Sequence, residues 1–160
     1  MTEPRWLDET QQQAWRALIA IVFRGFPQFD RTLKEHDLLV VHYSVLVALS
    51  EAPDYTMRLS ELAEQANVSQ SRLTHRLRVL VDRGDVELVT APGDGRGKNA
   101  TLTAAGLERV EVLAPLHVED VLQVIFDPLD EAETQALASA LTKIATPLCG
   151  SERFLKPKDA

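Results

Sequence analysis

Residues able to contact nucleic acid concentrate between Ser69 and Val81. This stretch holds three arginines and no acidic residue, although the 160-residue chain has 17 Lys and Arg against 24 Asp and Glu, a net charge of −7. Guanidinium groups bind phosphate oxygens and the acceptor atoms of guanine, so a local run of arginines suits a DNA contact. Residues 104–135 have the opposite character, with one base and eight acids. Charge is therefore segregated along the sequence, and the positive charge that a DNA contact needs is confined to a short stretch of an acidic chain.

The apolar spacing within the arginine-rich stretch predicts a helix that begins after Ser69, a favourable N-cap residue. Leu73, Leu77 and Leu80 define its buried side. At about 100° per residue, the opposite side presents hydroxyl, imidazole and guanidinium groups that can reach base edges in the major groove. The alternative is an ordinary solvated helix face. The outward residues are Ser71, His75 and Arg78, flanked by Arg72 and Thr74.

A glycine-rich turn over residues 92–99 supplies a second basic element. Arg96 stands between two glycines and is followed by Lys98, while Asp94 can pair with an arginine and fix the shape of the turn. Glycines allow close approach to a surface, and arginine suits the narrow, electronegative minor groove. A phosphate-binding loop needs glycine at its first position and serine or threonine at its last. Pro92 and Asn99 stand at those positions here, so such a loop is excluded. The alternative is a flexible basic surface turn.

The elements that position these two segments follow from periodicity and capping residues. Alternation predicts strands at 86–91 and 100–102, joined as a hairpin, and a minor strand at 57–59. The order is a helix-turn-helix and a β-wing between outer helices. The first helix is apolar on more than one side, which indicates a subunit interface. Helices are predicted at 8–34 with a kink at Pro27, 41–50, 61–66, 69–83, 103–125 with a kink at Pro115, and 131–145.

Composition narrows the class of protein. With 45% hydrophobic and 26% charged residues the chain is an ordinary globular protein, which excludes disordered and collagen-like sequences. No stretch reaches the roughly 18 apolar residues of a membrane span. The N-terminus lacks a signal-peptide pattern, so we expect a cytoplasmic protein without membrane contact. The single cysteine, Cys149, cannot form a disulfide within the chain.

Catalytic and metal-binding patterns are not found in the sequence. No nucleophile, paired-carboxylate or metal-ligand motif is present, so we expect neither an enzyme nor a bound cofactor. The four histidines, His36, His42, His75 and His117, are scattered. A zinc site would require folding to bring His42 or His117 beside a carboxylate such as Glu111 or Asp120. His117 is otherwise expected as a polar residue on an exposed helix face.

The motifs together resemble the MarR family of bacterial winged helix-turn-helix regulators, and the similarity covers about residues 10–146. The most specific part is the wing, where Asp94-Gly95-Arg96 is followed by Leu102-Thr103. The other matching stretches are 58–63 (Arg-Leu-Ser-Glu-Leu-Ala), 68–77 (Val-Ser-Gln-Ser-Arg-Leu-Thr-His-Arg-Leu), 80–84 (Leu-Val-Asp-Arg-Gly) and 102–106 (Leu-Thr-Ala-Ala-Gly).

The resemblance implies a mainly α (α+β) fold, a winged helix-turn-helix with N- and C-terminal dimerisation helices. It implies one domain over 1–149, with dimerisation helices at 8–36 and 104–147 around a winged helix at 38–103. Residues 150–160 lack hydrophobic periodicity, and we expect a flexible tail there. Many members are released from DNA by small aromatic or phenolic ligands bound between these parts. Candidate ligand-binding residues are Trp15, Phe23, His42 and Tyr43, each of which could instead be core or dimer interface.

The expected function is a homodimeric transcriptional regulator, a repressor that binds an inverted-repeat operator in double-stranded DNA. The alternative is a winged-helix protein-interaction module without DNA binding, which the net negative charge favours and the acid-free 69–81 stretch opposes. The predicted DNA-binding residues are Ser69, Gln70, Ser71, Arg72, Thr74, His75, Arg76, Arg78, Asp94, Arg96 and Lys98.

Overall fold

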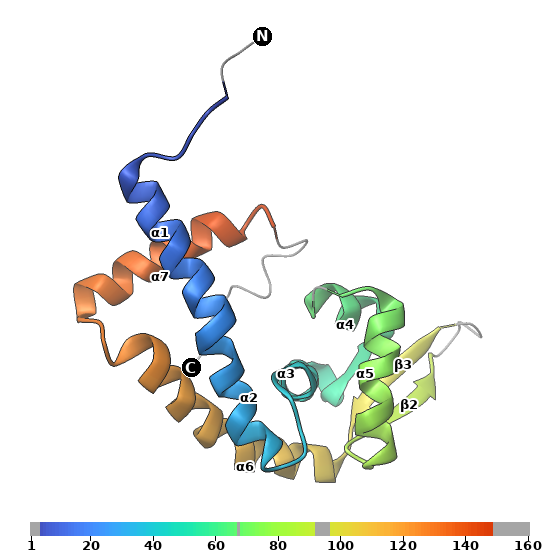
Figure 1. Cartoon of the computed structure of the whole chain (residues 1–160). Coiled ribbons are helices and arrows are strands. Elements are labelled where there is room, and N and C mark those ends of the chain that lie inside the picture. Colours follow the sequence, from blue (N-terminus) through green and yellow to red (C-terminus); the bar gives the residue numbers. More distant parts are fainter. Residues whose placement is uncertain (1–3, 67, 92–96, 149–160) are drawn as a thin grey trace.

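The computed structural model describes residues 4–66, 68–91 and 97–148. Within them are seven α-helices and a small sheet. Four of the helices form two long arms, residues 9–34 (the N-terminal arm) and 104–145 (the C-terminal arm), and the other three lie with the sheet in one body (Figure 1). The mainly helical winged-helix fold predicted from the sequence is confirmed. The elements are α1 (Glu9–Ala20), the π-helical turn η1 (Ile21–Gly25), α2 (Phe26–Lys34), α3 (Val40–Ser50), the 3-10 turn η2 (Pro53–Tyr55), β1 (Thr56–Arg58), α4 (Leu59–Gln65), α5 (Gln70–Asp82), β2 (Val86–Thr90), β3 (Lys98–Leu102), α6 (Ala104–Val121), the π-helical turn η3 (Leu122–Phe126) and α7 (Glu131–Ala145).

The three strands form an antiparallel sheet with β3 in the middle, in the order β1–β3–β2. Ala100 at the centre of β3 pairs with Met57 on one side and Leu88 on the other. The hydroxyl groups of Thr56 and Thr101 lie 2.9 Å apart across the first pair. The predicted hairpin is therefore present, and the minor strand completes the sheet that carries it.

Side-chain caps set where the longer helices begin. Asp8 and Gln11 form a capping box at α1, and Asp130 and Glu133 form another at α7. Thr103 caps α6 by accepting a hydrogen bond from the Gly106 N–H at 3.0 Å. Each cap satisfies a donor that the first helical turn leaves unpaired, so these boundaries follow from local sequence.

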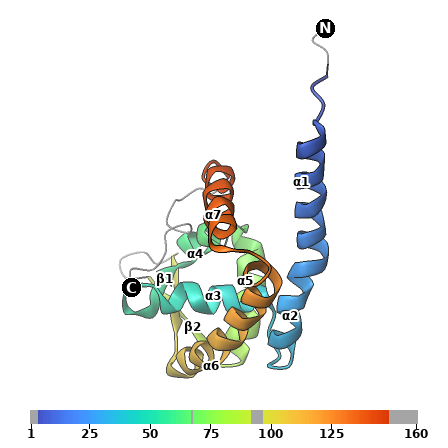
Figure 2. The same cartoon turned by 90° about the vertical axis from the view of Figure 1, so that its left-hand side faces the viewer.

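The N-terminal helix is interrupted, but not at the proline itself. α1, η1 and α2 follow one another as a continuous rod (Figure 2). The π-helical turn covers residues 21–25, immediately before Pro27. A proline ring clashes with the carbonyl four residues earlier, here that of Phe23, and the wider π turn contains that carbonyl. In the other long helix, α6 continues through Pro115 without a break.

The hydrophobic core lies in the winged helix, between α3, α4, α5 and the sheet. α6 contributes Leu113 to it, and α2 contributes Leu33. α3 is nearly all apolar because it is enclosed on several sides. The fully buried members include Leu33, Val45, Leu46, Leu49, Leu62, Leu73, Leu77, Leu80, Ala100 and Leu113.

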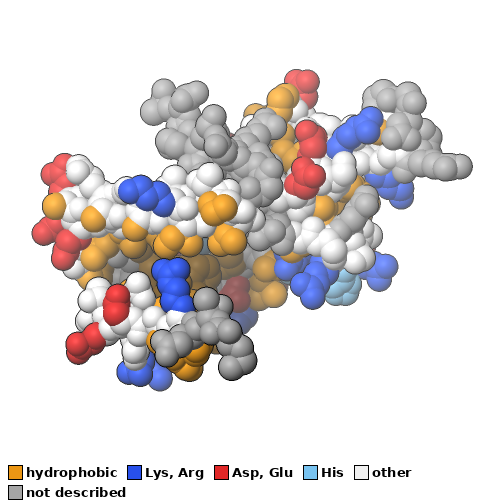
Figure 3. All heavy atoms as spheres, turned by 90° about the horizontal axis from the view of Figure 1, so that it is seen from above, with side chains coloured by type: hydrophobic (Ala, Val, Ile, Leu, Met, Phe, Trp, Pro, Cys, Tyr) orange, Lys and Arg blue, Asp and Glu red, His pale blue; other side chains and the backbone are white. Residues whose placement is uncertain are grey.

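The two helical arms leave apolar side chains uncovered. No residue of α1 or α7 is buried. α1 and α7 overlap in Figure 1 but lie apart in Figure 2, so they do not cover each other. Hydrophobic side chains gather along the arms, at the left of Figure 3. They include Trp15, Leu18, Val22, Phe23 and Phe26 near the N-terminus, and Leu122, Phe126, Leu141 and Ile144 near the C-terminus.

No helix among the described residues is long and apolar enough to cross a membrane.

Candidate nucleic-acid interface

Helix α5 is anchored by three leucines. Leu73, Leu77 and Leu80 have no exposed surface, which fixes the rotation of the helix about its axis. Ser69 caps its start, with Oγ 3.4 Å from the Arg72 N–H that donates to it. The helix ends before Gly84, whose φ of +78° is a conformation that favours glycine. The residues that the spacing predicted to face outward are all exposed, as are the cap residue Ser69 and, near the end of the helix, Val79 and Asp82. The predicted set is Ser71, Arg72, Thr74, His75 and Arg78.

Arg76 has a different environment from the outward residues of α5. It is half-buried, and its charge helps to lower the pKa of His42 at the start of α3. Burial is the larger cause of that lowering, and Arg83 contributes in the same direction. The His42 Nδ1 atom accepts a hydrogen bond from the Leu39 N–H at 3.3 Å. Arg76 is therefore less exposed than the outward residues of α5.

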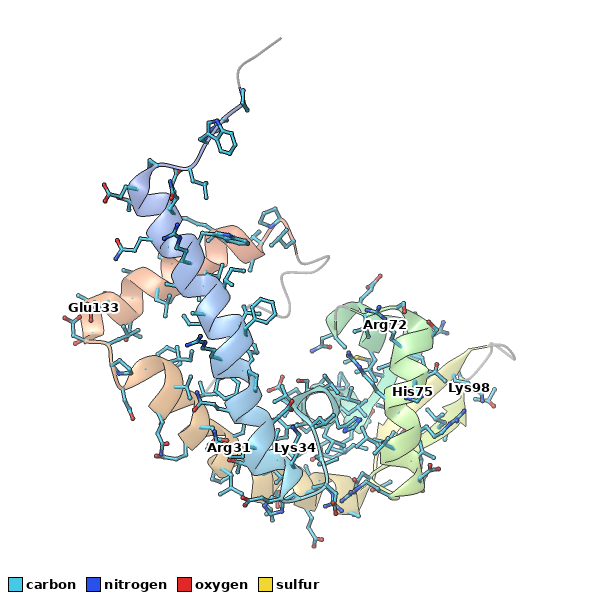
Figure 4. All side chains as sticks on the ribbon, in the orientation of Figure 1. Arg31, Lys34, Arg72, His75, Lys98 and Glu133 are labelled. Atoms are coloured by element: carbon cyan, nitrogen blue, oxygen red, sulfur yellow. The ribbon has the colours of Figure 1, made fainter. Side chains whose placement is uncertain are left out.

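The hairpin next to α5 supplies the second predicted element. Lys98 is exposed at the first position of β3, and the Ala91 N–H donates to the Gly97 carbonyl at 2.9 Å across the base of the turn. Figure 4 shows Arg72 and His75 along α5 and Lys98 on the neighbouring hairpin. Asp94, Arg96 and the side chain of Gln70 lie outside the described residues.

Charge is distributed unevenly over the winged helix. At the right of Figure 3, basic and histidine side chains gather along the lower edge of this body, and acidic side chains lie on its upper part. Glu133, in the acidic C-terminal stretch, lies at the far end of an arm, away from α5 (Figure 4). An anionic partner is therefore favoured at the α5 and hairpin side of the molecule.

The four residues predicted to bind a ligand do not form one cluster in this chain. Tyr43 is buried, His42 is half-buried, and both begin α3. Trp15 on α1 is 54% exposed and Phe23 on η1 is 72% exposed. Among the described residues, no ring contact joins either of these to Tyr43. The tyrosine ring instead lies 4.8 Å from the ring of His117.

The prediction that His117 lies on an exposed helix face is wrong. Its ring is half-buried between Tyr43 of α3 and Phe29 of α2, with centroids 4.8 Å and 5.9 Å away. Burial lowers the pKa of His117, and Asp120 opposes this shift. The signal was present in the sequence, since His117 follows the buried Leu113 by four residues and so shares its helix face.

The zinc alternative is not supported. No group of three or more His, Cys, Asp or Glu side chains is placed to hold a metal ion in the part of the chain that the structure describes. His42 and His117 instead have hydrogen-bond or ring contacts with the protein.

Sequence reasoning also missed a buried carboxylate beside α5. Asp85, between α5 and β2, has no exposed surface. Its Oδ1 accepts a hydrogen bond from Arg109 Nε at 2.9 Å, and its Oδ2 lies 3.4 Å from Arg83 Nε. Arg109 is 24 residues away along the chain, and local periodicity carries no signal for such a pair.

Comparison with known proteins agrees with this geometry. A family model described as the MarR family matches residues 36–97, which span the helix-turn-helix and the first strand of the hairpin. Among curated proteins, the chain is 30% identical over 108 residues to the HTH-type transcriptional repressor IacR of Pseudomonas putida. That match spans 68% of this chain and 63% of the repressor.

Two solved structures from Streptomyces coelicolor are similar over nearly the whole chain. Sco3205, a MarR family transcriptional regulator solved in complex with DNA, is 36% identical, with a TM-score of 0.87 and 96% of each chain covered. AbsC, another MarR family regulator, is 34% identical, with a TM-score of 0.86, 92% of this chain covered and 100% of AbsC. A chain that shares both fold and more than 30% identity with these regulators along nearly its full length belongs to the MarR family of transcriptional regulators.

Proposed function

We propose that the chain is a sequence-specific DNA-binding repressor that acts as a homodimer in the cytoplasm. α5 would enter the major groove and the β2–β3 hairpin would follow the adjacent minor groove. The observation that carries the proposal is the exposed face of α5, where hydroxyl, imidazole and guanidinium groups project beside the basic hairpin. The similarity to Sco3205, solved with DNA, and to the repressor IacR supports it.

The proposed contacts divide into two kinds. Arg72, at the start of α5, and Lys98, on the hairpin, would bind phosphates. Ser71, in the first turn of α5, and His75 and Arg78, farther along the helix, would read base edges. Phosphate contacts set register and orientation, while base contacts give sequence preference. Arg96 remains proposed for the minor groove on its place in the sequence.

The proposal of a homodimer rests on the arms. Trp15, Phe23 and Ile144 are each more than half exposed in the single chain, and similar side chains continue along both arms. Contiguous exposed apolar surface of this kind marks an interaction site. A two-fold dimer presents two copies of α5 and so selects an inverted repeat, with half-site centres about 10 base pairs apart.

We further infer that a small aromatic or phenolic compound releases the dimer from DNA. The start of α3, with His42 and Tyr43, adjoins α2 and α6, where the arms meet the winged helix. Trp15 and Phe23 are exposed on the N-terminal arm, so their part in this site depends on how the arms assemble. Binding of salicylate-like phenols, followed by tryptophan fluorescence, tests this inference.

The experiment is selection of bound duplexes from a random DNA pool, followed by affinity measurements across salt concentrations. We expect an inverted repeat and a steep fall in affinity with salt, with a logarithmic slope of about −0.9 for each phosphate contacted. Arg78→Ala should cost about 1–3 kcal/mol at one position of each half-site. The matched control is Arg31→Ala, which removes an exposed arginine on α2, separate from α5 (Figure 4). A folded dimer that enriches no motif and shows no salt dependence would instead favour the protein-interaction module.

A further inference from the structure

A buried charge cluster joins α5 to both arms. Asp85 is the one charged residue with a fully buried side chain in the described part of the molecule. A buried carboxylate is strongly unfavourable unless it is paired, so its partners have to be held in place. Those partners, Arg109 and Arg83, come from different elements: Arg109 from α6 and Arg83 from the end of α5.

The backbone at Asp85 is held as firmly as its side chain. Its N–H donates to the Leu80 carbonyl in α5 at 2.9 Å. Its carbonyl accepts from the Thr103 N–H, at the start of α6, at 3.1 Å. The Thr103 hydroxyl donates to the Gly84 carbonyl at 2.7 Å. The end of α5, the start of β2 and the start of α6 therefore meet at Asp85.

Arg83 extends the cluster to the N-terminal arm. Its Nη1 donates to the Asp37 carbonyl at 3.2 Å, and its Nη2 donates to the His36 carbonyl at 3.3 Å. Both carbonyls belong to the turn between α2 and α3. The carboxylate thus connects α5 and the hairpin directly to α6, and to α2 through one arginine.

We propose that Asp85 is a positioning residue that fixes the angle of α5 and the hairpin relative to the arms. In the dimer this angle sets the separation of the two α5 helices, and hence the half-site spacing that the protein accepts. The inference rests on the proposed function. It assigns spacing selectivity to a residue that does not contact DNA, because the Arg109 Nε–H donates to Oδ1 of the carboxylate while the charge of Arg83 lies beside Oδ2.

The test measures affinity for duplexes that carry the selected half-sites at the selected spacing and at spacings shifted by one or two base pairs. A duplex with one half-site is measured beside them. Asp85→Asn keeps the shape of the side chain and removes its charge. Glu108→Gln, at an exposed position next to Arg109 on α6, is the matched control. If the wild-type protein binds none of these duplexes, the proposed function is contradicted. If the wild type binds and the variants keep its spacing preference, only this inference fails.

For Asp85→Asn we expect affinity for the single half-site to stay within about twofold of wild type. The preference for the selected spacing should fall by about tenfold, within the range typical of coupling between sites. An unchanged spacing preference overturns the inference, even if the thermal midpoint drops, because that pattern marks a structural role alone.

A second pair of variants keeps the inference testable if Asp85→Asn does not fold. Arg109→Lys retains the charge and Arg109→Gln removes it. We expect the preference for the selected spacing to be strongest in the wild type, weaker in Arg109→Lys and weakest in Arg109→Gln. A spin label at Glu87→Cys, exposed on β2, in a Cys149→Ser background reports the distance between the two hairpins. That distance distribution should broaden in the same order, and identical distributions refute the positioning role.

Discussion

Gly106 offers a sharp test of how closely α6 packs on the winged helix. It is buried in the first turn of α6. A Cβ atom there would lie 2.2 Å from the Asp85 carbonyl oxygen and 2.6 Å from Leu102 Cδ1. The carbonyl is backbone and cannot rotate away as a flexible side chain can. Gly106→Ala therefore requires α6 and the end of α5 to separate by about 1 Å to restore an ordinary carbon–oxygen contact.

Two opposing effects decide the sign of this substitution. Alanine is favoured over glycine inside a helix by about 1 kcal/mol. Overpacking in a well-packed site costs about 1–3 kcal/mol, and a backbone obstacle places this site at the upper end of that range. The overpacking cost is the larger effect. The expected result is a net loss of about 2 kcal/mol in the free energy of unfolding.

The assay is urea unfolding followed by circular dichroism, at one fixed protein concentration because dimerisation adds to stability. Ala105→Gly, at the exposed neighbouring position, is the control. It changes helix propensity without a clash and should cost no more than about 1 kcal/mol. A Gly106→Ala protein as stable as wild type, or more stable, would refute the close approach of α6 to Asp85.

Three further outcomes are expected. The pKa of His117 is lowered from 6.5 in the folded protein, so the unfolded state takes up protons first as the pH falls below that value, and the free energy of unfolding decreases. His117→Phe should therefore reduce the difference in urea midpoint between pH 7 and pH 5.5. Leu113→Ala, in the core contact of α6, should lower the free energy of unfolding by about 2–5 kcal/mol in the same assay. Ile144→Asp, on the exposed apolar face of α7, should give a folded monomer in sedimentation equilibrium, and a retained dimer would contradict the interface proposed there.

The parts of the fold that depend on neighbouring residues were predictable from the sequence. The leucine spacing gave the rotation of α5, and Thr103 and Asp130 marked helix starts at the positions observed. β3 was predicted two residues short. Its first residues, Lys98 and Asn99, are polar, and they join the strand because they pair with β2 and β1. The start of β3 is therefore set by pairing across the sheet, and the local sequence pattern carries no signal for it.

The features that were missed depend on contacts between distant parts of the chain. His117 is enclosed by α2 and α3, and Asp85 is paired with an arginine on another helix. A charged residue after a glycine ordinarily indicates a solvated turn, because burial is unfavourable without a partner. The partner is supplied by the fold. Contact residues on the outside of α5 could therefore be predicted, whereas the residues that hold α5 in place could not.

The acidic charge of the chain is compatible with DNA binding because of where it lies. At physiological ionic strength the Debye length is about 8 Å, so charges at the far ends of the arms, such as Glu133, are screened from a duplex at α5. The exposed arginines of α5 then act locally on the phosphates. At low salt the screening weakens, and a charge of −7 for each chain opposes association. We therefore expect the salt dependence of affinity to flatten at low ionic strength, and replacing Glu131 and Glu133 by Gln should reduce this flattening. A curve unchanged by these substitutions would show that the acidic arm has no effect on DNA affinity.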